Sequence, residues 1–502
     1  MNSEYAPAPA GAAPIVPDGA VAPEPGATTP AAGTEVGIDT IPIPLPLAVP
    51  LPLETERGSV SATASPDHGG VYEPPPVTGA ITVPVEPILP APVSAAPGPA
   101  APGPAAPPLA APLPAVPPLD QWQFAPYLQW SMQHIEDFLP VHPIRRGDRA
   151  VDFGRRDADI GGLTVMHPWE DRSASFSEVM ASTHTDGWMI LHRGTVVGEE
   201  YLGEFGVGGM HLLMSVSKSL TATVAGLLAE SEQLDLDTLV TAYVPELAGS
   251  GYEGALVRHL VDMRTGVRFS EEYLNDAAEV RLLEEAIGWA PRRHPGVPDT
   301  LLGFLATLGQ KGPHGGAFDY KSCETDALGF VIQGAAGAHA AEVMSERLWR
   351  PMGAEFDAHV GVDGVGAGMF DGGVSAAMRD LARFGHLYVN GGCALDGARV
   401  LPEWWVADTF TGGPDSRAAF AGSPEPTFMP GGMYRNGFWF PGESGDVMLA
   451  LGIHGQMIYM NRLTGVVGVK VSSWPTPQDA EKLFWTVRAF ETASWALETG
   501  AA

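Results

Sequence analysis

Cysteine is scarce in this chain: its 502 residues include only two, Cys323 and Cys393. Two thiols provide neither a disulfide framework nor the clustered ligands of a structural zinc site. The glycine-rich stretch 364–373 also lacks the Gly-x-Gly-x-x-Gly spacing and the lysine of a phosphate-binding loop. We therefore expect no metal and no nucleotide cofactor, and a reducing compartment is compatible with the cysteine count.

Positive charge is the second shortage. Lys and Arg total 28 against 59 Asp and Glu, which gives a formal net charge of −31. Such an acidic chain argues against nucleic acid or an anionic membrane surface as a partner. The first residues lack the basic and apolar regions of a secretory signal, and five prolines interrupt the apolar stretch Ile41–Leu53. We therefore expect a cytoplasmic protein without a membrane span.

Proline is unevenly distributed, because 30 of the 48 prolines lie in residues 1–120. This segment is also rich in alanine and glycine, has few charges and contains no lysine. Proline interrupts helices and strand ladders, and such a composition cannot bury a core. We predict a disordered Pro/Ala-rich arm over residues 1–116. Residues 117–500 are enough for a large core, in one domain or two interlocked lobes.

The stretch Leu213–Leu220, Leu-Met-Ser-Val-Ser-Lys-Ser-Leu, is predicted to open a helix. Apolar residues then recur at the spacing of one buried helix face: Leu220, Val224, Leu227 and Leu228. Ser215 and Lys218 are three residues apart, so one helical turn places the amine above the hydroxyl. A serine is a poor nucleophile until a base takes its proton. Burial and the positive end of a helix dipole both favour a neutral amine, which can be that base.

The same pattern has a plainer interpretation. Chance would place a serine three residues before one of the five lysines in roughly one such chain in four. Ser215 would then cap the helix, and Lys218 would be a solvated surface charge. The neighbouring residues are apolar on both sides, however, which is a poor setting for a solvated lysine. We therefore favour a catalytic pair, in which the unpaired backbone N–H of Ser215 also donates to an oxyanion.

Periodicity along the rest of the chain predicts strands at both ends of the folded part. Residues 187–201 have the pattern of two strands joined at Arg193-Gly194, and four more strands are predicted between residues 438 and 472. Gln478–Leu497 is predicted as a closing amphipathic helix and Leu119–Leu139 as an opening helix. Gly266–Gly309 is predicted to be irregular.

This order of elements indicates an α+β fold. We expect an antiparallel sheet assembled from both ends of the chain and flanked by helices, with an all-helical lobe inserted between them. The α/β lobe would cover about residues 117–228 and 366–500. The helical lobe would cover about residues 229–365.

A Ser–Lys pair also needs a group that protonates the leaving group. Tyr320-Lys321-Ser322 is a candidate, since a tyrosine between two cations can lose its proton near neutral pH; a half-buried structural tyrosine is the alternative. A second oxyanion N–H could come from His454-Gly455-Gln456, where glycine allows close backbone approach.

Together these motifs resemble the serine β-lactamase and DD-peptidase-like hydrolases, in the order Ser-x-x-Lys, Tyr-x-Ser and His-Gly-Gln. Longer segments are similar to the 6-aminohexanoate-dimer hydrolases, and the resemblance covers roughly Leu119–Leu497. These segments are 214–219 (Met-Ser-Val-Ser-Lys-Ser), 262–267 (Asp-Met-Arg-Thr-Gly-Val), 318–322 (Phe-Asp-Tyr-Lys-Ser) with 325–326 (Thr-Asp), 372–375 (Gly-Gly-Val-Ser) and 434–439 (Tyr-Arg-Asn-Gly-Phe-Trp). The resemblance implies a β-lactamase/transpeptidase-like fold.

The resemblance also implies roles. Ser215 would be the acylated nucleophile, Lys218 its proton acceptor, and Tyr320 the relay to the leaving group. The N–H groups of Ser215 and of Gln456 or Met457 would form the oxyanion hole. The remaining candidates for substrate and oxyanion binding are His454, Gly455, Ser322, Tyr273, which would position an amide, and Trp439, which would line the acyl pocket.

One departure bears on function, since His454-Gly455-Gln456 stands where β-lactamases have Lys-Thr-Gly. That lysine helps to bind the carboxylate of β-lactams. We therefore expect a serine hydrolase that cleaves a small linear amide or carboxylic ester through an acyl-enzyme. The alternatives are a penicillin-binding or β-lactamase function, and a catalytically idle scaffold whose Pro-rich arm recruits partners. The expected partner is a small-molecule substrate, and a homodimer stays open.

Overall fold

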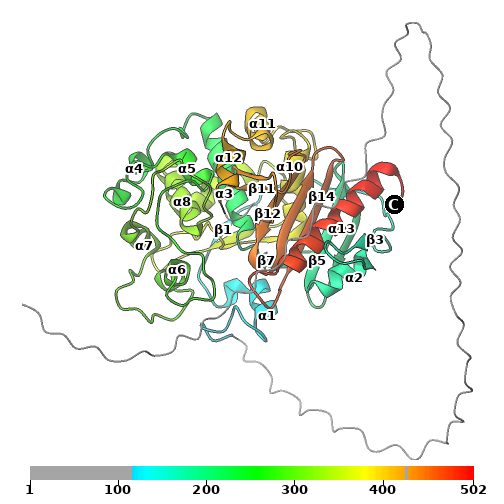
Figure 1. Ribbon diagram of the computed structural model, residues 1–502, viewed down its shortest axis with the longest axis horizontal. Coiled ribbons are helices and arrows are strands. Elements are labelled where there is room, and N and C mark those ends of the chain that lie inside the picture. The colour runs from blue at the N-terminus through cyan, green and yellow to red at the C-terminus, as the bar shows by residue number, and fades with distance from the viewer. Residues whose placement is uncertain (1–115, 424–427) are drawn as a thin grey trace, which may run out of the picture. The chain divides into compact units, whose positions relative to one another are not determined.

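The computed structural model describes residues 116–423 and 428–502, so the predicted arm lies outside the described residues apart from Val116. The main element is an eight-stranded sheet with the order β10-β11-β12-β13-β14-β5-β6-β2 (Figure 1). Its strands are antiparallel except for the pair β2 and β6. They are β2 (Gly154–Arg155), β5 (Thr185–His192), β6 (Thr195–Tyr201), β10 (Met433–Arg435), β11 (Phe438–Phe440), β12 (Val447–Gly452), β13 (Gln456–Asn461) and β14 (Val466–Ser472).

Strands from the two ends of the described chain meet in the middle of this sheet. β5 pairs with β14, with Leu191 opposite Val467 and Met189 opposite Val469. This confirms the prediction of a sheet assembled from both ends. β5 and β6 are joined at Arg193-Gly194, where both residues have positive φ, 51° and 78°. Such a conformation suits a two-residue hairpin turn.

Alternate residues of the strands contribute to two separate cores. On one face, Leu191, Ile458 and Val469 pack in a cluster that includes residues of α3 (Val216–Glu230) and α10 (Met378–Val389). On the other face, Ile190 and Tyr459 pack in a cluster with residues of α2 (Phe176–Ser182) and α13 (Ala480–Thr499). Since side chains alternate across a strand, buried residues on both faces make the sheet a middle layer between helices (Figure 1).

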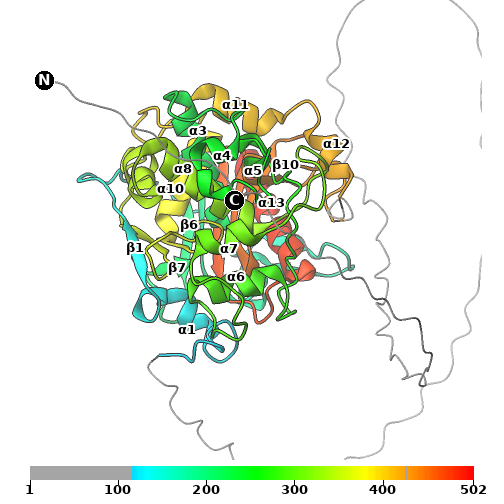
Figure 2. The same cartoon turned by 90° about the vertical axis from the view of Figure 1, so that its left-hand side faces the viewer.

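The chain between α3 and β9 is mainly helical, and most of its helices gather beside the main sheet (Figure 2). They are α4 (Val240–Tyr243), η2 (Pro245–Leu247), α5 (Val257–Val261), α6 (Glu279–Ile287), α7 (Leu301–Thr307), α8 (Ser322–Ala336), α9 (Ala340–Met344) and η3 (Ser345–Trp349). This is the inserted helical lobe of the predicted fold.

A four-stranded antiparallel sheet, ordered β1-β8-β9-β7, adjoins this lobe. β8 lies inside the range that we assigned to the helical lobe, but it pairs with β1 and β9. The predicted lobe boundaries stay a prediction. The strands and remaining elements are β1 (Val141–Ile144), β7 (Met210–Leu212), β8 (Ala358–Gly361), β9 (Val374–Ala377), β3 (Thr164–Met166), β4 (Ser173–Ser175), α1 (Leu128–Gln133), η1 (Ile135–Asp137), α11 (Glu403–Thr411), α12 (Ser416–Ala421) and η5 (Ile453–Gly455).

Two local predictions were wrong. Leu119–Leu139 is not one helix, because turns continue to Tyr127 and only the short α1 and η1 follow. Pro126 has no backbone N–H to donate, so the helix begins after it. Gly266–Gly309 is not irregular, since it contains α6 and α7. In α6, Val280, Leu283 and Ile287 are buried and have the spacing of one helix face, a pattern that indicates a helix.

Candidate active site

Ser215 lies where the chain leaves β7 and enters α3. Leu213 N donates to the carbonyl of Val374 in the small sheet. Met214 has a left-handed backbone conformation with a φ of 47°. Ser215, the next residue, is half-buried and occupies the N-cap of α3. This sharp change of direction places the serine at a helix start, where backbone N–H groups have no partner within the helix.

Lys218 lies one turn into α3 and is only 1% exposed. Its Nζ lies 3.1 Å from Ser215 Oγ, 3.0 Å from Ser322 Oγ and 2.7 Å from the carbonyl oxygen of Asp371. A solvated surface lysine, the plainer interpretation, is therefore wrong. The predicted buried face of α3 is confirmed at Leu220, Val224 and Leu228, and the burial extends to nearly the whole helix, which packs against α8, β12 and their neighbours.

Three buried carboxyl groups surround this pair, and none of them is a predicted site residue. Asp371 Oδ2 lies 3.8 Å from Lys218 Nζ, and Asp371 N donates to Asp326 Oδ1 over 3.0 Å. Glu271 accepts a hydrogen bond from Ser322 N. Burial raises the pKa of all three carboxyls, and the Asp371 carboxylate raises the pKa of Asp326 further. Raised pKa values favour neutral acids, which limits the negative charge beside the amine.

Tyr320 contacts the pair from the segment before α8. Tyr320 lines the same cavity as Ser215, and Lys218 Nζ lies 5.2 Å from the centre of its ring. Burial, followed by the Glu271 carboxylate, raises the pKa of Tyr320 well above its ordinary value. The predicted tyrosine between two cations is wrong, since Lys321 Nζ binds Glu324 instead, at 2.7 Å. Tyr320 is therefore a neutral phenol, able to donate a proton.

The other candidates near the tyrosine lie beside the same site. Tyr273 is hydrogen-bonded to the Glu271 carboxylate. Trp439 lies against Tyr320, with 5.3 Å between ring centres. Ser322, through its bond from Lys218, occupies the place that the Tyr-x-Ser motif predicts. The structure thus brings together residues from four separate parts of the sequence.

The third motif is arranged differently from the prediction. His454 is buried, its Nδ1 donates to the Trp474 carbonyl over 2.7 Å, and burial lowers its pKa to about 4. It is not among the described residues that line the cavity beside Ser215. Gly455 has a φ of 95°, and a Cβ there would lie 2.3 Å from the Trp474 ring. The glycine therefore allows close approach of a tryptophan rather than of a substrate.

The backbone that touches Ser215 precedes this motif. A Cβ placed on Gly452 would lie 3.1 Å from Ser215 N and 2.5 Å from the Leu213 carbonyl oxygen. Gln456 uses its side-chain amide to bind the backbone of Ser472 in both directions. Met457, the other predicted donor, is paired within the sheet on both sides. Gly452 therefore lies directly against the serine, and Ile453, unlike Gln456 and Met457, lines the small hollow next to Ser215 as well as the large cavity.

A cavity of about 390 Å³ opens beside Ser215. It lies between the ends of β12 and β13, the segment before β10 and the start of α13. Seven predicted site residues line it: Ser215, Tyr273, Tyr320, Trp439, Gly455, Gln456 and Met457. Its size is within the usual range for small-molecule sites, about 300–1,000 Å³.

A hollow of about 30 Å³ lies on another side of Ser215, where Gln123 and Glu284 form part of its lining. Gln123 Nε2 donates to Glu284 Oε1 over 2.9 Å, and burial raises the pKa of Glu284 to about 7. Neither residue was a predicted site residue. The sequence offers no signal for them, because the opening segment and α6 meet only in the fold.

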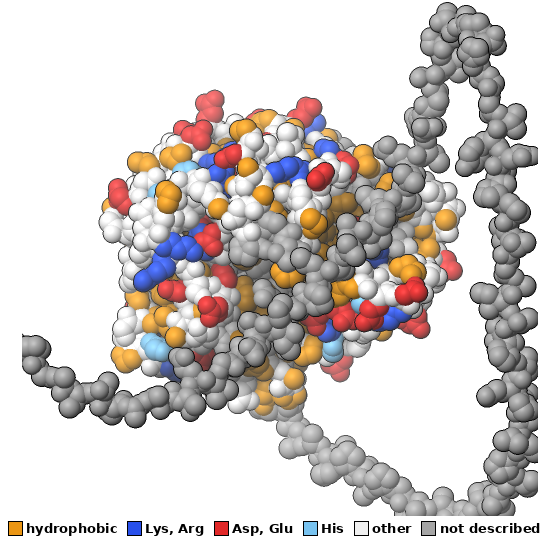
Figure 3. Space-filling view, in the orientation of Figure 1, with side chains coloured by type: hydrophobic (Ala, Val, Ile, Leu, Met, Phe, Trp, Pro, Cys, Tyr) orange, Lys and Arg blue, Asp and Glu red, His pale blue; other side chains and the backbone are white. Residues whose placement is uncertain are grey.

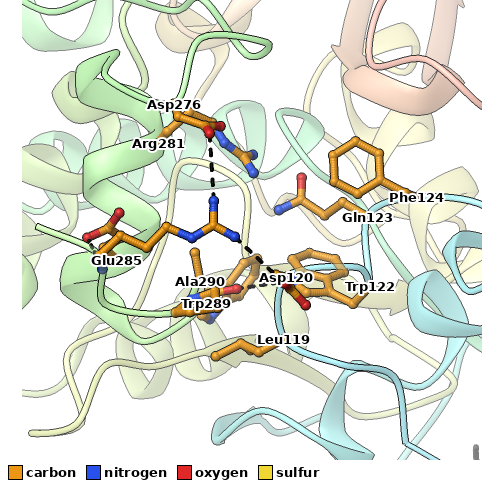
Figure 4. Close-up of a pocket in the computed structure, with 12 residues that line it drawn as sticks. Leu119, Asp120, Trp122, Gln123, Phe124, Asp276, Arg281, Glu285, Trp289 and Ala290 are labelled. Atoms are coloured by element: carbon orange, nitrogen blue, oxygen red, sulfur yellow. Dashed lines mark hydrogen bonds and ion pairs between the residues drawn. The ribbon is translucent and has the colours of Figure 1, made fainter.

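The opening segment also borders a separate pocket of about 100 Å³, shown in Figure 4. There Arg293 lies 3.6 Å from both Asp120 and Asp276, and Trp122 Nε1 donates to the Trp289 carbonyl over 3.0 Å. Ser215 does not line this pocket. These bonds fasten the opening segment to the helical lobe, so that Gln123 stays in place behind the serine.

The exterior carries no single charge type on the face in Figure 3, where acidic and basic side chains are interspersed with apolar ones. Across residues 116–423 and 428–502, no helix is long and apolar enough to cross a membrane. Nor do the described residues contain a group of three or more His, Cys, Asp or Glu arranged to hold a metal ion.

Comparison with known proteins agrees with this geometry. The Beta-lactamase family model matches residues 173–491. A 6-aminohexanoate-dimer hydrolase from Paenarthrobacter ureafaciens is 36% identical over 362 residues, which is 72% of this chain and 89% of that protein. A solved structure named "Putative 6-aminohexanoate-dimer hydrolase from Bacillus anthracis" is 25% identical with a TM-score of 0.70. That match covers 76% of this chain and 97% of the other.

These matches span the strands from both ends of the sheet and the helical lobe between them. They agree with the α+β, β-lactamase/transpeptidase-like fold and with a serine hydrolase. The chain belongs to the Beta-lactamase family, as a serine hydrolase of that superfamily.

Proposed function

We propose that the chain hydrolyses a small linear amide or carboxylic ester through an acyl-enzyme on Ser215. The observation that carries this proposal is the contact of 3.1 Å between Lys218 Nζ and Ser215 Oγ beside a cavity large enough for a small molecule. The hydrolase from Paenarthrobacter ureafaciens, named for a linear amide, supports the substrate class.

In the proposed reaction, Lys218 accepts the Ser215 proton while Oγ attacks the carbonyl carbon. The carbonyl oxygen becomes an oxyanion, which the Ser215 N–H stabilises. The second donor that we propose is the Ile453 N–H, in place of Gln456 or Met457. What supports it is the approach of Gly452 to Ser215 and the position of Ile453 in the lining of the same cavity.

Tyr320 completes the proposed proton path. As a neutral phenol next to Ser215, it donates its proton to the departing nitrogen or oxygen and recovers one from Lys218. The bond from the carbonyl carbon to the leaving group then breaks and leaves an ester on Ser215. Water attacks this ester, and the same groups return the proton to Ser215. A cytoplasmic location and a homodimer stay predictions.

Intact-mass spectrometry would test the nucleophile. Wild type and Ser215→Ala would be exposed briefly to p-nitrophenyl butyrate, a 6-aminohexanoate dimer and a penicillin. We expect a mass increase, or turnover, only with Ser215 present, and a loss of turnover of roughly 10⁴-fold or more in the variant. Ser217→Ala is the matched control, because the Ser217 hydroxyl accepts from Val374 N, 3.1 Å away.

Three outcomes are informative. The same mass increase in wild type and Ser215→Ala would contradict the mechanism. A stable penicillin adduct without turnover of the ester or the dimer would favour the penicillin-binding alternative. Failure of all three compounds to react would favour the idle scaffold.

A further inference from the structure

The cavity beside Ser215 is mostly apolar. Away from the serine, its wall is formed by side chains of β12, β13, α13 and the segments that precede β10 and α13. Its large apolar members include Met429, Leu451, Met457, Trp474, Leu483 and Phe484. Such a wall gains free energy by removing apolar surface of a substrate from water.

Cations are missing from this wall. Among the described residues that line the cavity, none is Lys, Arg or His, and the two charged ones are Glu271 and Asp479. Lys482, a cation close in sequence to the lining, forms an ion pair with Asp479. Asp479 also accepts a bond from the Lys482 N–H and so caps α13 with its own carboxylate. A carboxylate of a substrate would therefore meet two acids and no cation.

The position of Tyr320 indicates which part of a substrate lies here. Tyr320 and Trp439 line the large cavity and not the small hollow behind Ser215. In the proposed mechanism Tyr320 protonates the leaving group. The leaving group must therefore lie within reach of the phenol, on the side of the large cavity.

We propose that the large cavity takes an uncharged apolar alcohol or amine portion as the leaving group and disfavours one that ends in a carboxylate. This inference rests on the proposed function and names its substrate class. The proposed preference also differs from that expected of an enzyme that hydrolyses 6-aminohexanoate dimers, because the leaving group of such a dimer ends in a carboxylate.

A matched series of butyrate esters would test it, with purified full-length protein and release of butyrate as the readout. The leaving alcohols would be ethanol, butanol, hexanol and 6-hydroxyhexanoate. We expect kcat/KM to rise about fourfold per methylene until the cavity is full. The 6-hydroxyhexanoate ester should fall at least about tenfold below hexyl butyrate, because its carboxylate would be desolvated without a partner.

A variant that adds a cation sharpens the test. Leu483→Arg should raise kcat/KM for the carboxylate ester and lower it for hexyl butyrate. Leu463→Arg is the control, because Leu463 is 60% exposed and does not line the cavity. It should leave both values within about twofold of wild type, as is usual for surface substitutions.

The outcomes separate this inference from the function on which it rests. Equal kcat/KM for hexyl butyrate and the carboxylate ester would overturn it. A second series of ethyl esters with acyl chains of different length would also test it. If kcat/KM depended on the length of the acyl chain and not on that of the leaving alcohol, the apolar wall would hold the acyl group, and the inference would be overturned. If no ester reacts and no adduct forms on Ser215, the proposed function fails first and the inference fails with it.

Discussion

Two lysines of the described residues, Lys218 and Lys470, are buried against a serine hydroxyl, and they differ in what surrounds them. Lys218 contacts Ser215 from one turn along a helix. Lys470 contacts Ser472 from two residues away on β14, where alternate side chains share a face. Both lysines are almost fully buried, at 1% and 0% exposure. Chemistry alone would make either pair a nucleophile with its base.

Their surroundings separate them. Ser215 lines a cavity and lies at a helix start, whereas Ser472 is fully buried and lines none of the cavities described above. Lys218 has the carboxyl of Asp371 3.8 Å away, while Lys470 binds the Thr183 carbonyl and has no carboxylate in contact. A buried amine beside a hydroxyl is therefore not sufficient for a site. Access for a substrate and a donor for the oxyanion decide between the pairs.

The largest expected effect is a difference in kcat/KM between variants of the two lysines. Lys218→Ala should lower kcat/KM with p-nitrophenyl butyrate by roughly 10³-fold or more, because Ser215 loses its proton acceptor. Lys470→Met should leave kcat/KM within about threefold, because Lys470 does not line the cavity beside Ser215. Steady-state kinetics on both variants, with circular dichroism to check folding, measures this difference. Similar losses in the two variants would contradict the assignment of the catalytic pair.

The second prediction concerns stability and pH. Burial lowers the pKa of Lys470 from 10.5 to about 7. Between these values the unfolded chain holds a proton that the folded protein has released. The contribution of Lys470 to the free energy of unfolding should therefore rise with pH by about 1.4 kcal/mol per unit. Below about pH 7 Lys470 is protonated in both the folded and the unfolded state. The free energy that its burial costs is then at its maximum and no longer depends on pH.

Lys470→Met should remove this slope. Urea unfolding of wild type and variant at about pH 7.5 and 9 would measure it. The stability advantage of the variant should shrink by about 2 kcal/mol across that interval. Lys311→Met is the control, because Lys311 is exposed and ion-paired with Asp319, and its charge is not among the causes of the lowered pKa of Lys470. A difference between wild type and Lys470→Met that does not depend on pH would show that Lys470 keeps an ordinary pKa.

The two pairs also show what a sequence can predict. Ser215 and Lys218 were found because the turn of a helix fixes the separation of residues three apart. The hairpin at Arg193-Gly194 and the closing helix α13 follow from local rules of the same kind. Lys470-Val471-Ser472 matches no catalytic motif. The alternation of side chains along a strand nevertheless places Lys470 and Ser472 on the same face, in contact with each other.

Long-range partners could not be predicted in this way. Asp371 and Glu271 reach Lys218 only through the packing of segments distant in the sequence. Adjacency in the sequence wrongly predicted that Lys321 is one of two cations beside Tyr320. The backbone of Lys321 is extended, with φ −146° and ψ 117°, so its side chain points away from that of Tyr320. His454 was assigned by its motif, but the structure directs its imidazole to the Trp474 carbonyl.

The last prediction concerns Ser322, the second serine that Lys218 contacts. Ser322→Ala removes one acceptor from Lys218 Nζ but leaves Ser215 Oγ and the Asp371 carbonyl in place. A hydrogen bond to a charged group contributes about 1.5–3 kcal/mol, so we expect kcat/KM to fall about tenfold to a hundredfold. Ser322→Asn restores an acceptor and should recover part of the loss, whereas Ser472→Ala should change stability and not kcat/KM. If Ser322→Ala had full activity, two acceptors would be enough to hold Lys218 against Ser215, and the analogy between the two pairs would end at the lysines.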